Sequence, residues 1–334
     1  MIDRPADADA YADDADLRAL IEAFFAQSFA TDNPLITEAV RRMLAAGGKR
    51  LRPRVTLLAA EAAGGDPREH LPLAAYMELI HVATLIHDDV VDRADMRRGV
   101  NATAIDYGNR ISVLAGDYLF AWIFKNVTAA YPAPVPHILS STLADICDGE
   151  VLQLRALGNV GLTIAGYVDI VLKKTAALFA ASAECGAIMG GASALRVKAL
   201  RDFGLYYGIA FQMLDDVLDA SADPGELGKP VGNDLRERKM TLPVIFALEF
   251  GPDDLRAHLK RYYLGAGGDE YPGAIRLLLD GIAQAGALEK SREAIAGYVE
   301  RAKMSLAPLG KARARTELAR LADALLRSGE RATR

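Results

Sequence analysis

Two copies of one acidic pattern carry the strongest chemical signal in this sequence. The segments Asp88-Asp89-Val90-Val91-Asp92 and Asp215-Asp216-Val217-Leu218-Asp219 each follow an apolar run. On a helix, the first and last aspartates of each pattern lie one turn apart, so their like charges project side by side. Mg²⁺ relieves such repulsion, because it takes a few carboxylates and shares its remaining positions with water and phosphate oxygens. One such pattern is also typical of an exposed helix end, but two in matching contexts predict a cavity where two facing carboxylate clusters hold a diphosphate through Mg²⁺.

Basic residues near both motifs supply positive charge for phosphate groups. They are Lys49, Arg50 and Arg52 after a glycine pair, Arg97 and Arg98 after the first motif, Lys174 in mid-chain, and Lys229 and Lys239 after the second motif. Arginine makes planar two-point contacts to phosphate, whereas lysine provides a point charge. An isolated Arg-Arg-Gly is usually a solvated helix end. Beside an expected Mg²⁺ site, these residues instead predict two anionic substrates, one held through metal and one by side chains directly.

The helical wheel places further polar groups with the aspartates. His81, Asp88 and Asp92 share one helix face, and Gln212 shares a face with Asp215 and Asp219. A histidine on an apolar helix is more often a core residue, but His81 lies two turns from Asp88 on the same face. The wheel therefore favours a site role for His81.

The elements that must position these residues are helices. Apolar residues recur at intervals of three and four along the chain, and stretches of strand-like alternation are absent. Glycine and proline clusters interrupt the pattern at 64–67, 131–136, 158–161, 223–225, 251–252 and 265–273. We expect about ten to thirteen helices in a single all-α domain, residues 17–334, preceded by a frayed arm, residues 1–16. Cys147 and Cys185 lie in apolar helical stretches and are expected to be buried thiols.

Composition limits the classes of function. Of 334 residues, 51% are hydrophobic, which is ample for a large core, and 39 Lys and Arg against 44 Asp and Glu give a net charge of −5. This balance gives nucleic acid binding no electrostatic support. The sequence shows neither a transmembrane helix nor the basic and apolar regions of a signal peptide, so we expect a cytoplasmic protein.

The motifs together resemble those of the trans-isoprenyl (polyprenyl) diphosphate synthases over about residues 40 to 250. The matching segments are GGKRLRP (47–53), ELIHVATLIHDDVVDRADMRRG (78–99), YGNRISVLAGDYL (107–119), GEVLQL (149–154), KTAALF (174–179), FQMLDDVLD (211–219) and LGKPVGNDLRERKMTLP (227–243). The resemblance implies the isoprenoid synthase fold, a single bundle of mostly antiparallel helices around a deep central cavity, generally as a homodimer. It also implies head-to-tail condensation of isopentenyl diphosphate with geranyl, farnesyl or geranylgeranyl diphosphate. About three Mg²⁺ ions per site would be needed, with Mn²⁺ as a substitute.

The resemblance also assigns roles to individual positions. The metal ligands would be Asp88, Asp92, Asp215 and Asp219. The isopentenyl diphosphate would be held by Lys49, Arg52, His81 and Arg98, and the allylic diphosphate by Arg97, Lys174, Lys229 and Lys239. Thr175 and Gln212 match polar groups near the developing cation. Arg238 departs from the pattern, because the family usually has glycine before the lysine.

The charges suggest how such a site would work. Ionisation of the allylic C–O bond leaves an extra negative charge on diphosphate, and metal ions and basic side chains stabilise that charge as it develops. The alkene of isopentenyl diphosphate then attacks the carbocation, and loss of a proton completes the step. The sequence offers no obvious side-chain base near the motifs, so the departing diphosphate is the expected proton acceptor. Apolar helix walls would exclude water, which quenches the cation.

Product length depends on the residues that precede the first motif. By resemblance, bulky side chains four or five positions before Asp88 would stop growth at farnesyl or geranylgeranyl length, but Thr84 and Ala83 are small. Deeper on the same helix lie Ile80 and Tyr76, the latter about 18 Å from Asp88 along the axis. We therefore expect long products, roughly hexaprenyl to decaprenyl diphosphate, as precursors of quinone side chains, with transient membrane contact on product release. A short-chain synthase is the alternative.

Three other classes fit the sequence less well. A class I terpene cyclase also has an aspartate-rich motif, but its second metal motif is an Asn/Ser/Glu set. A head-to-head squalene or phytoene synthase would lack the Lys49 and Arg52 pair. A non-catalytic subunit of a heteromeric synthase typically has lost an aspartate motif, and both are intact in this sequence.

Overall fold

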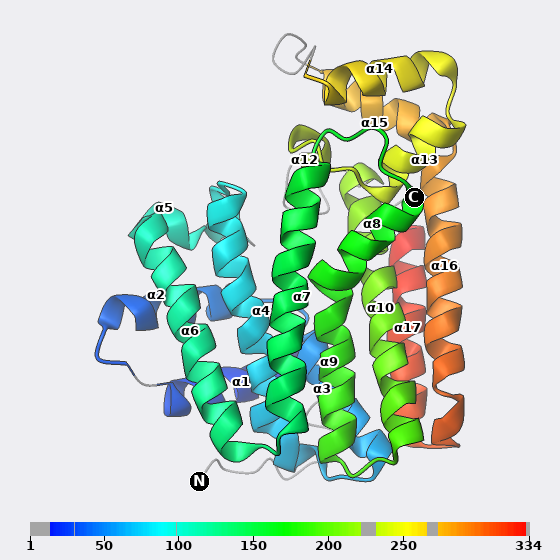
Figure 1. Ribbon diagram of the computed structural model, residues 1–334. Helices are drawn as coiled ribbons and strands as arrows, with labels where there is room; N and C mark the ends of the chain where they lie inside the picture. Colours follow the sequence, from blue (N-terminus) through cyan, green and yellow to red (C-terminus); the bar gives the residue numbers. More distant parts are fainter. Residues whose placement is uncertain (1–13, 30, 98, 222–231, 266–272, 332–334) are drawn as a thin grey trace. The chain divides into compact units, whose positions relative to one another are not determined.

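The described residues are almost entirely helical. The computed structural model describes residues 14–29, 31–97, 99–221, 232–265 and 273–331 (Figure 1). Within these ranges, the extended structure is limited to a hairpin of two-residue strands, β1 (Met96–Arg97) and β2 (Val100–Asn101), which pair antiparallel. The expected all-α class is thus confirmed. The first described helix begins at Asp14, so three residues of the expected arm are helical, and residues 1–13 lie outside the described residues.

Contacts divide the chain into two compact units. The first unit comprises residues 1–140 and 181–198, and the second comprises residues 141–180 and 199–334. The helices α7 (Pro134–Ala156), α9 (Ala177–Met189) and α10 (Ala194–Ser221) each contribute a segment to both units.

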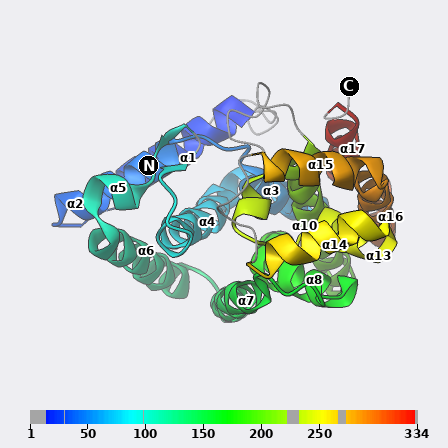
Figure 2. The same cartoon turned by 90° about the horizontal axis from the view of Figure 1, so that it is seen from above.

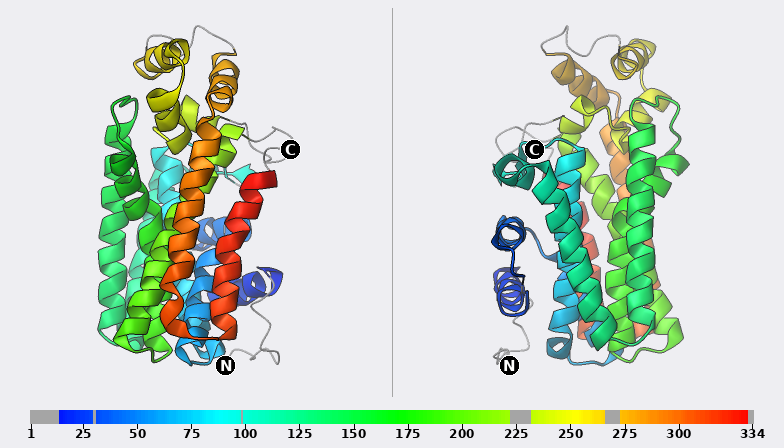
Figure 3. Two further views of the ribbon diagram at one scale, coloured as in Figure 1. Left: turned by 90° about the vertical axis from the view of Figure 1, so that its right-hand side faces the viewer. Right: turned by 60° about the vertical axis from the view of Figure 1, so that its left-hand side comes forward.

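The first unit is built on the long helix α4. Its other elements are α1 (Asp14–Ser28), α2 (Pro34–Ala45), α3 (Leu51–Ala63), the short η1 (Pro67–His70), α4 itself (Leu71–Val91), the hairpin, α5 (Thr103–Tyr107) and α6 (Asn109–Ala130). Helix α4 is apolar on nearly every side and packs against α3 and α6 (Figures 1 and 3). A helix so placed is expected to be hydrophobic all round. It carries the first aspartate motif at its last turn.

The second unit carries the second motif at the end of α10. Its remaining elements are α8 (Ile164–Val171), η2 (Leu172–Ala176), α12 (Asn233–Arg236), α13 (Leu242–Phe250), α14 (Asp253–Tyr263), α15 (Ala274–Gln284), α16 (Ala287–Ser305), η3 (Ala307–Leu309) and α17 (Arg313–Arg331). Helices α16 and α17 pack side by side, and the shorter α13, α14 and α15 contact one another (Figures 1 and 2). The described residues form more helices than expected because several breaks enclose short helical turns.

Two glycines on α10 allow a neighbouring backbone to come unusually close. A Cβ atom added to Gly204 would lie 2.4 Å from the carbonyl oxygen of Phe179, and one on Gly208 would lie 2.6 Å from the Cα of Ala176. Real Cβ atoms do not approach other atoms so closely, so any larger residue would force these helices apart. Gln212 follows one turn after Gly208 on the same face. The glycines therefore set the distance between Gln212 and the segment around Ala176.

The structure also tests two expectations about membranes and cysteines. Among the described residues, no helix is both long enough and apolar enough to span a bilayer. Cys185 is buried, as expected, but the expectation for Cys147 is wrong, because its side chain is exposed on α7. Val151 and Leu154, which share its helix face, are exposed as well, so this face of α7 is apolar but is not covered within the described residues.

The close approach at Gly204 predicts a stability change of definite sign. Gly204→Ala should lower the free energy of unfolding by about 1–3 kcal/mol, because the methyl group would overlap a backbone carbonyl that cannot easily move. The matched control is Gly297→Ala on α16, where an added Cβ meets no atom within 4 Å. That change should raise stability by about 0.5–1 kcal/mol through helix propensity. Urea unfolding of both variants measures the difference, and equal shifts would contradict the close approach.

Candidate active site

The first aspartate motif ends helix α4 with its outer carboxylates accessible. Asp88 and Asp92 are both half-buried, and the backbone N–H of Asp92 donates to the carbonyl oxygen of Asp88 at 2.7 Å. The helical turn therefore continues through Asp92, so the two side chains project from one face. This is the arrangement that the sequence predicts for a pair of metal ligands.

The middle aspartate of the first motif, Asp89, is buried and binds an arginine side chain. Asp89 is fully buried, and its Oδ1 accepts a hydrogen bond from Arg97 Nε at 2.7 Å and forms an ion pair with Arg97 Nη2 at 2.5 Å. The β1–β2 hairpin brings Arg97 back over the last turn of α4. Sequence reasoning missed Asp89, although its position one residue after Asp88 already turns it about 100° away from the metal face. Asp89 fixes the guanidinium that we expect to bind the allylic diphosphate.

The basic segment before α3 is organised around a buried arginine. Arg50 is 1% exposed and has a left-handed backbone with φ of 46°. Its Nη1 donates to Glu78 Oε1 at 2.7 Å, and its Nη2 donates to the carbonyl oxygen of Leu44 at 2.6 Å. Glu78 is also buried, on α4, three residues before His81. The pair thus ties the segment that carries Lys49 to the helix that carries His81, and Arg50 is a structural residue rather than a phosphate ligand.

The other expected ligands of isopentenyl diphosphate in this unit are reachable. Lys49 is exposed, and Arg52 and His81 are half-buried. Arg98, expected in the same group, lies outside the described residues.

The expected chain-length residues follow one another down α4. Thr84 is half-buried and its hydroxyl donates to the carbonyl oxygen of His81 at 2.8 Å, whereas Ala83 and Ile80 are fully buried. Tyr76 is buried in an aromatic cluster, with its ring 5.5 Å from that of Phe24 and 5.7 Å from that of Trp122. Bulky rings therefore gather at Tyr76, and small or aliphatic residues occupy the turns between it and Asp88.

In the second unit, a chain of hydrogen bonds runs through the second motif. The hydroxyl of Thr175 donates to Gln212 Oε1 at 2.9 Å, and Gln212 Nε2 donates to Asp216 Oδ1 at 2.9 Å. The hydroxyl of Tyr167 donates to Asp216 Oδ2 at 2.6 Å. The sequence analysis named Thr175 and Gln212 but missed Tyr167 and Asp216. Asp216 is buried, whereas the preceding Asp215 is exposed, so the second motif repeats the division of the first.

The segment η2 is a π-helical turn that carries Lys174 and Thr175. The backbone N–H of Ala177 donates to the carbonyl oxygen of Leu172, five residues earlier. Such a turn inserts one residue into a helix and re-aims its side chains, and it is frequent at functional sites. Gly149 of α7 accommodates it, because a Cβ there would lie 2.5 Å from the backbone nitrogen of Lys174. Lys174 also forms an ion pair with Glu150, the next residue of α7.

Asp219, the last residue of the second motif, holds the start of α12. Asp219 Oδ1 accepts the backbone N–H of Asn233 at 3.2 Å, and its Oδ2 accepts that of Asp234 at 3.0 Å. Each carboxylate oxygen has a second lone pair, so these bonds leave capacity for a metal ion. Lys239, an expected ligand of the allylic diphosphate, pairs with Glu237 at 2.5 Å. Lys229 lies outside the described residues.

Burial and mutual repulsion change the acidity of this cluster. Burial is the largest cause that raises the pKa of Asp216 to about 7, against the hydrogen bonds from Tyr167 and Gln212, which lower it. Burial also raises the pKa of Asp219 and, more strongly, that of Asp234. Asp234 is a further member of the acidic cluster that sequence reasoning missed. Crowded acids of this kind are typical of functional sites and of sites that bind cations.

The donor set fits Mg²⁺ that is shared with a substrate. In the part of the chain that the structure describes, no three His, Cys, Asp or Glu side chains are grouped so as to hold a metal by themselves. Mg²⁺ is usually bound by one or two carboxylates together with substrate phosphates and water. Asp88, Asp92 and Asp215 are more exposed carboxylates of the two motifs and suit that role, whereas Asp89 and Asp216 are buried.

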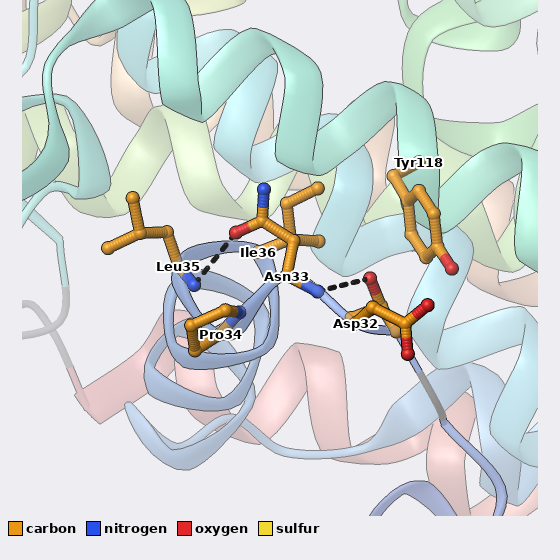
Figure 4. A pocket seen from close by; sticks show the side chains of 7 residues that line it. Asp32, Asn33, Pro34, Leu35, Ile36 and Tyr118 are labelled. Carbon is orange, nitrogen blue, oxygen red and sulfur yellow. Dashed lines mark hydrogen bonds between the residues drawn. The ribbon is translucent and has the colours of Figure 1, made fainter.

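A surface pocket elsewhere in the first unit contains none of the predicted residues. It has a volume of about 560 Å³ and is lined by Thr31, Asp32, Asn33, Pro34, Leu35, Ile36 and Tyr118 (Figure 4). Asn33 begins α2, since its side-chain oxygen accepts the backbone N–H of Leu35 at 3.1 Å. The side-chain oxygens of Thr31 and Asn33 accept backbone N–H groups at the start of this helix.

Comparison with known proteins agrees with these motifs. The model of the polyprenyl synthetase family matches residues 33–270. The chain belongs to the polyprenyl synthetase family. A decaprenyl diphosphate synthase from Rhodobacter capsulatus superposes with a TM-score of 0.88 at 40% identity, covering 98% of this chain and 100% of the other.

Two further relatives are similar to this chain over most of its length. A polyprenyl synthase from Caulobacter crescentus, solved with calcium and isoprenyl diphosphate, has a TM-score of 0.87 at 37% identity and covers 96% of this chain and 97% of its own. The octaprenyl diphosphate synthase of Escherichia coli is 37% identical over 273 residues, 82% of this chain and 84% of its own. Members of the family are Mg²⁺-dependent and use isopentenyl and allylic diphosphates. This polyprenyl synthetase is therefore a trans-prenyltransferase.

The buried pair of Arg50 and Glu78 predicts a large loss of stability when one partner is removed. Glu78→Ala should lower the free energy of unfolding by about 3–5 kcal/mol, because it leaves a guanidinium inside the unit without its counter-charge. The matched control is Asp280→Ala, which removes an exposed ion pair with Arg276 and should cost less than about 1 kcal/mol. Chemical denaturation measures both, and a similar small cost for the two variants would contradict a structural role for Arg50.

Proposed function

We propose that the protein elongates an allylic diphosphate with isopentenyl diphosphate to a long-chain, all-trans polyprenyl diphosphate, which serves as a quinone side-chain precursor. The observation that carries this proposal is the matched state of the two aspartate motifs. In each, the outer carboxylates are accessible and the middle one is buried under hydrogen-bond donors. Diphosphate and isoprenoid chemistry also appear in the names of the relatives, including the structure with calcium and isoprenyl diphosphate.

The two motifs would act on the diphosphate that leaves. Asp88, Asp92, Asp215 and Asp219 are the proposed ligands of about three Mg²⁺ ions, with Mn²⁺ as a substitute. The metal ions would supply positive charge to the departing diphosphate. Arg97, Lys174, Lys229 and Lys239 are proposed to add charge directly. The three of these that are described each pair with a carboxylate, which holds the cationic group in place.

A separate set of residues would hold isopentenyl diphosphate, whose diphosphate is not lost. We assign Lys49, Arg52, His81 and Arg98 to it. The buried pair of Arg50 and Glu78 supports this assignment, because it joins the segment of Lys49 to the helix of His81. Thr175 and Gln212 are assigned to the allylic cation, toward which a hydroxyl oxygen can direct its lone pairs.

Chain length would be decided along α4. Thr84 and Ala83 leave room next to Asp88, and the aromatic cluster at Tyr76 is the proposed floor, with Ile80 between them. This spacing favours hexaprenyl to decaprenyl products over farnesyl or geranylgeranyl diphosphate. Geranyl, farnesyl and geranylgeranyl diphosphate are the candidate starters. The family resemblance supports a homodimer and a transient membrane contact on product release, and the cytoplasmic location stays a prediction.

The metal assignment predicts a severe loss of activity without loss of the fold. Asp88→Ala or Asp215→Ala should lower turnover by about three orders of magnitude, because each metal supplies several kcal/mol of transition-state stabilisation. EDTA should have the same effect, and added Mg²⁺ should reverse it. The control is Asp254→Ala, an exposed aspartate in the first turn of α14. Incorporation of labelled isopentenyl diphosphate by the purified chain is the measurement, and full activity with chelator present would overturn the proposal.

The wall assignment predicts shorter products. Thr84 lies one turn before Asp88, so Thr84→Phe, alone or with Ala83→Phe, should stop elongation at about three or four isoprene units. Tyr76→Ala should lengthen the product. The matched control is Thr128→Phe on α6, since Thr128 is exposed and its hydroxyl also bonds to its own helix.

Chromatography of the dephosphorylated products measures the chain length that each variant makes. Overpacking could cost about 1–3 kcal/mol, so the melting temperature of each variant is measured as well. An unchanged product ladder from a folded, active Thr84→Phe/Ala83→Phe enzyme would show that length is set elsewhere.

A further inference from the structure

Tyr167 is a buried residue of the second unit to which the proposed reaction assigns no role. It lies on α8, is 4% exposed, and its hydroxyl donates to Asp216 Oδ2 at 2.6 Å. At 2.6 Å this hydrogen bond is shorter than the one from Gln212 to the same carboxyl group, at 2.9 Å. The hydroxyl is therefore committed to one oxygen of the middle aspartate.

The other oxygen of Asp216 determines how the amide of Gln212 is turned. Gln212 Nε2 donates to Asp216 Oδ1 at 2.9 Å, so the NH₂ of the amide faces the aspartate. The amide oxygen then points the opposite way, toward Thr175, and accepts its hydroxyl proton at 2.9 Å. If Gln212 were turned over, its oxygen would face Asp216 Oδ1, and its NH₂ would donate to the Thr175 hydroxyl, whose proton would then point elsewhere.

The direction of the Thr175 hydroxyl follows from this chain. Its single proton is committed to Gln212, so the remaining directions around the oxygen present lone pairs. The π-helical turn of η2 and the close approach at Gly208 hold Thr175 at the required distance from α10. Thr175 and Asp216 are both buried, so water does not compete strongly for these bonds.

We propose that Tyr167 and Asp216 are positioning residues that act through Gln212 to hold the Thr175 oxygen with its lone pairs toward the allylic cation. An oxygen fixed in this way stabilises positive charge as it develops, without reorientation at the moment of ionisation. The inference rests on the proposed role of Thr175 beside the cation. It assigns Tyr167 no contact with substrate and no part in the binding of isopentenyl diphosphate.

Removal of one hydroxyl tests this inference in the full-length enzyme. Tyr167→Phe should lower kcat about tenfold, because the short hydrogen bond that orients Asp216 is lost, while KM for isopentenyl diphosphate stays within about twofold. Tyr262→Phe is the control, since Tyr262 is another buried tyrosine of this unit, on α14. Both variants should melt within a few degrees of the wild type. A wild-type kcat in Tyr167→Phe, or an equal loss in Tyr262→Phe, would overturn the inference.

A double-mutant cycle separates positioning from general loss of structure. If Tyr167 acts through Thr175, the double variant Tyr167→Phe/Thr175→Val should have nearly the kcat/KM of Thr175→Val alone. Tyr167→Phe combined with Lys49→Ala should instead show the product of the two single effects, because Lys49 is assigned to the other substrate. Multiplying effects in the first cycle would refute the inference. An inactive wild type would refute the proposed function instead, so the two failures are distinguishable.

Discussion

Repulsion among aspartates at the end of a helix is the constraint on which both units depend. Each motif places three carboxylates within about one and a half turns, where their charges oppose folding. Both units reduce the repulsion in the same way: the middle aspartate is buried and accepts hydrogen bonds from side chains of its own unit. In the first unit the donor is the guanidinium of Arg97, and in the second the donors are Tyr167 and Gln212. The outer aspartates keep the accessibility that a metal ion needs.

The hydrogen-bond donors that reach the aspartates also connect each motif to other elements of its unit. Arg97 is brought to Asp89 by the β1–β2 hairpin, and the first turn of α12 supplies the N–H groups of Asn233 and Asp234 that Asp219 accepts. The same hydrogen bonds therefore fix the hairpin and the start of α12 against the aspartates. Because a metal ion favours the ionised carboxylates, loading of the site and ordering of these segments should reinforce each other.

The sequence was sufficient for the parts of the site that follow from helical periodicity. The faces of α4 and α10, the accessible state of Asp88, Asp92 and Asp215, and the all-α class follow from spacing and from apolar runs. It could not indicate partners that come from distant segments, such as Tyr167 for Asp216 or Glu78 for Arg50. The π-helical turn at Lys174 was also hidden, because α9, which follows it, is apolar on most faces and does not show a shift of one residue in its pattern. Arg50 was grouped with the phosphate ligands because charge alone does not show that a side chain points inward.

Arg238 stands where the resemblance leads us to expect glycine, and its backbone has the left-handed conformation that favours glycine, with φ of 55°. The carbonyl oxygen of Arg238 accepts the N–H of Gly158 at 3.0 Å. The conformation costs a non-glycine residue about 1–2 kcal/mol. The turn places Lys239 next to Glu237, so the strain lies directly beside a residue assigned to the diphosphate. Backbone strain is tolerated where the surrounding contacts determine the conformation. Here the strained turn at Arg238 holds Lys239 beside Glu237.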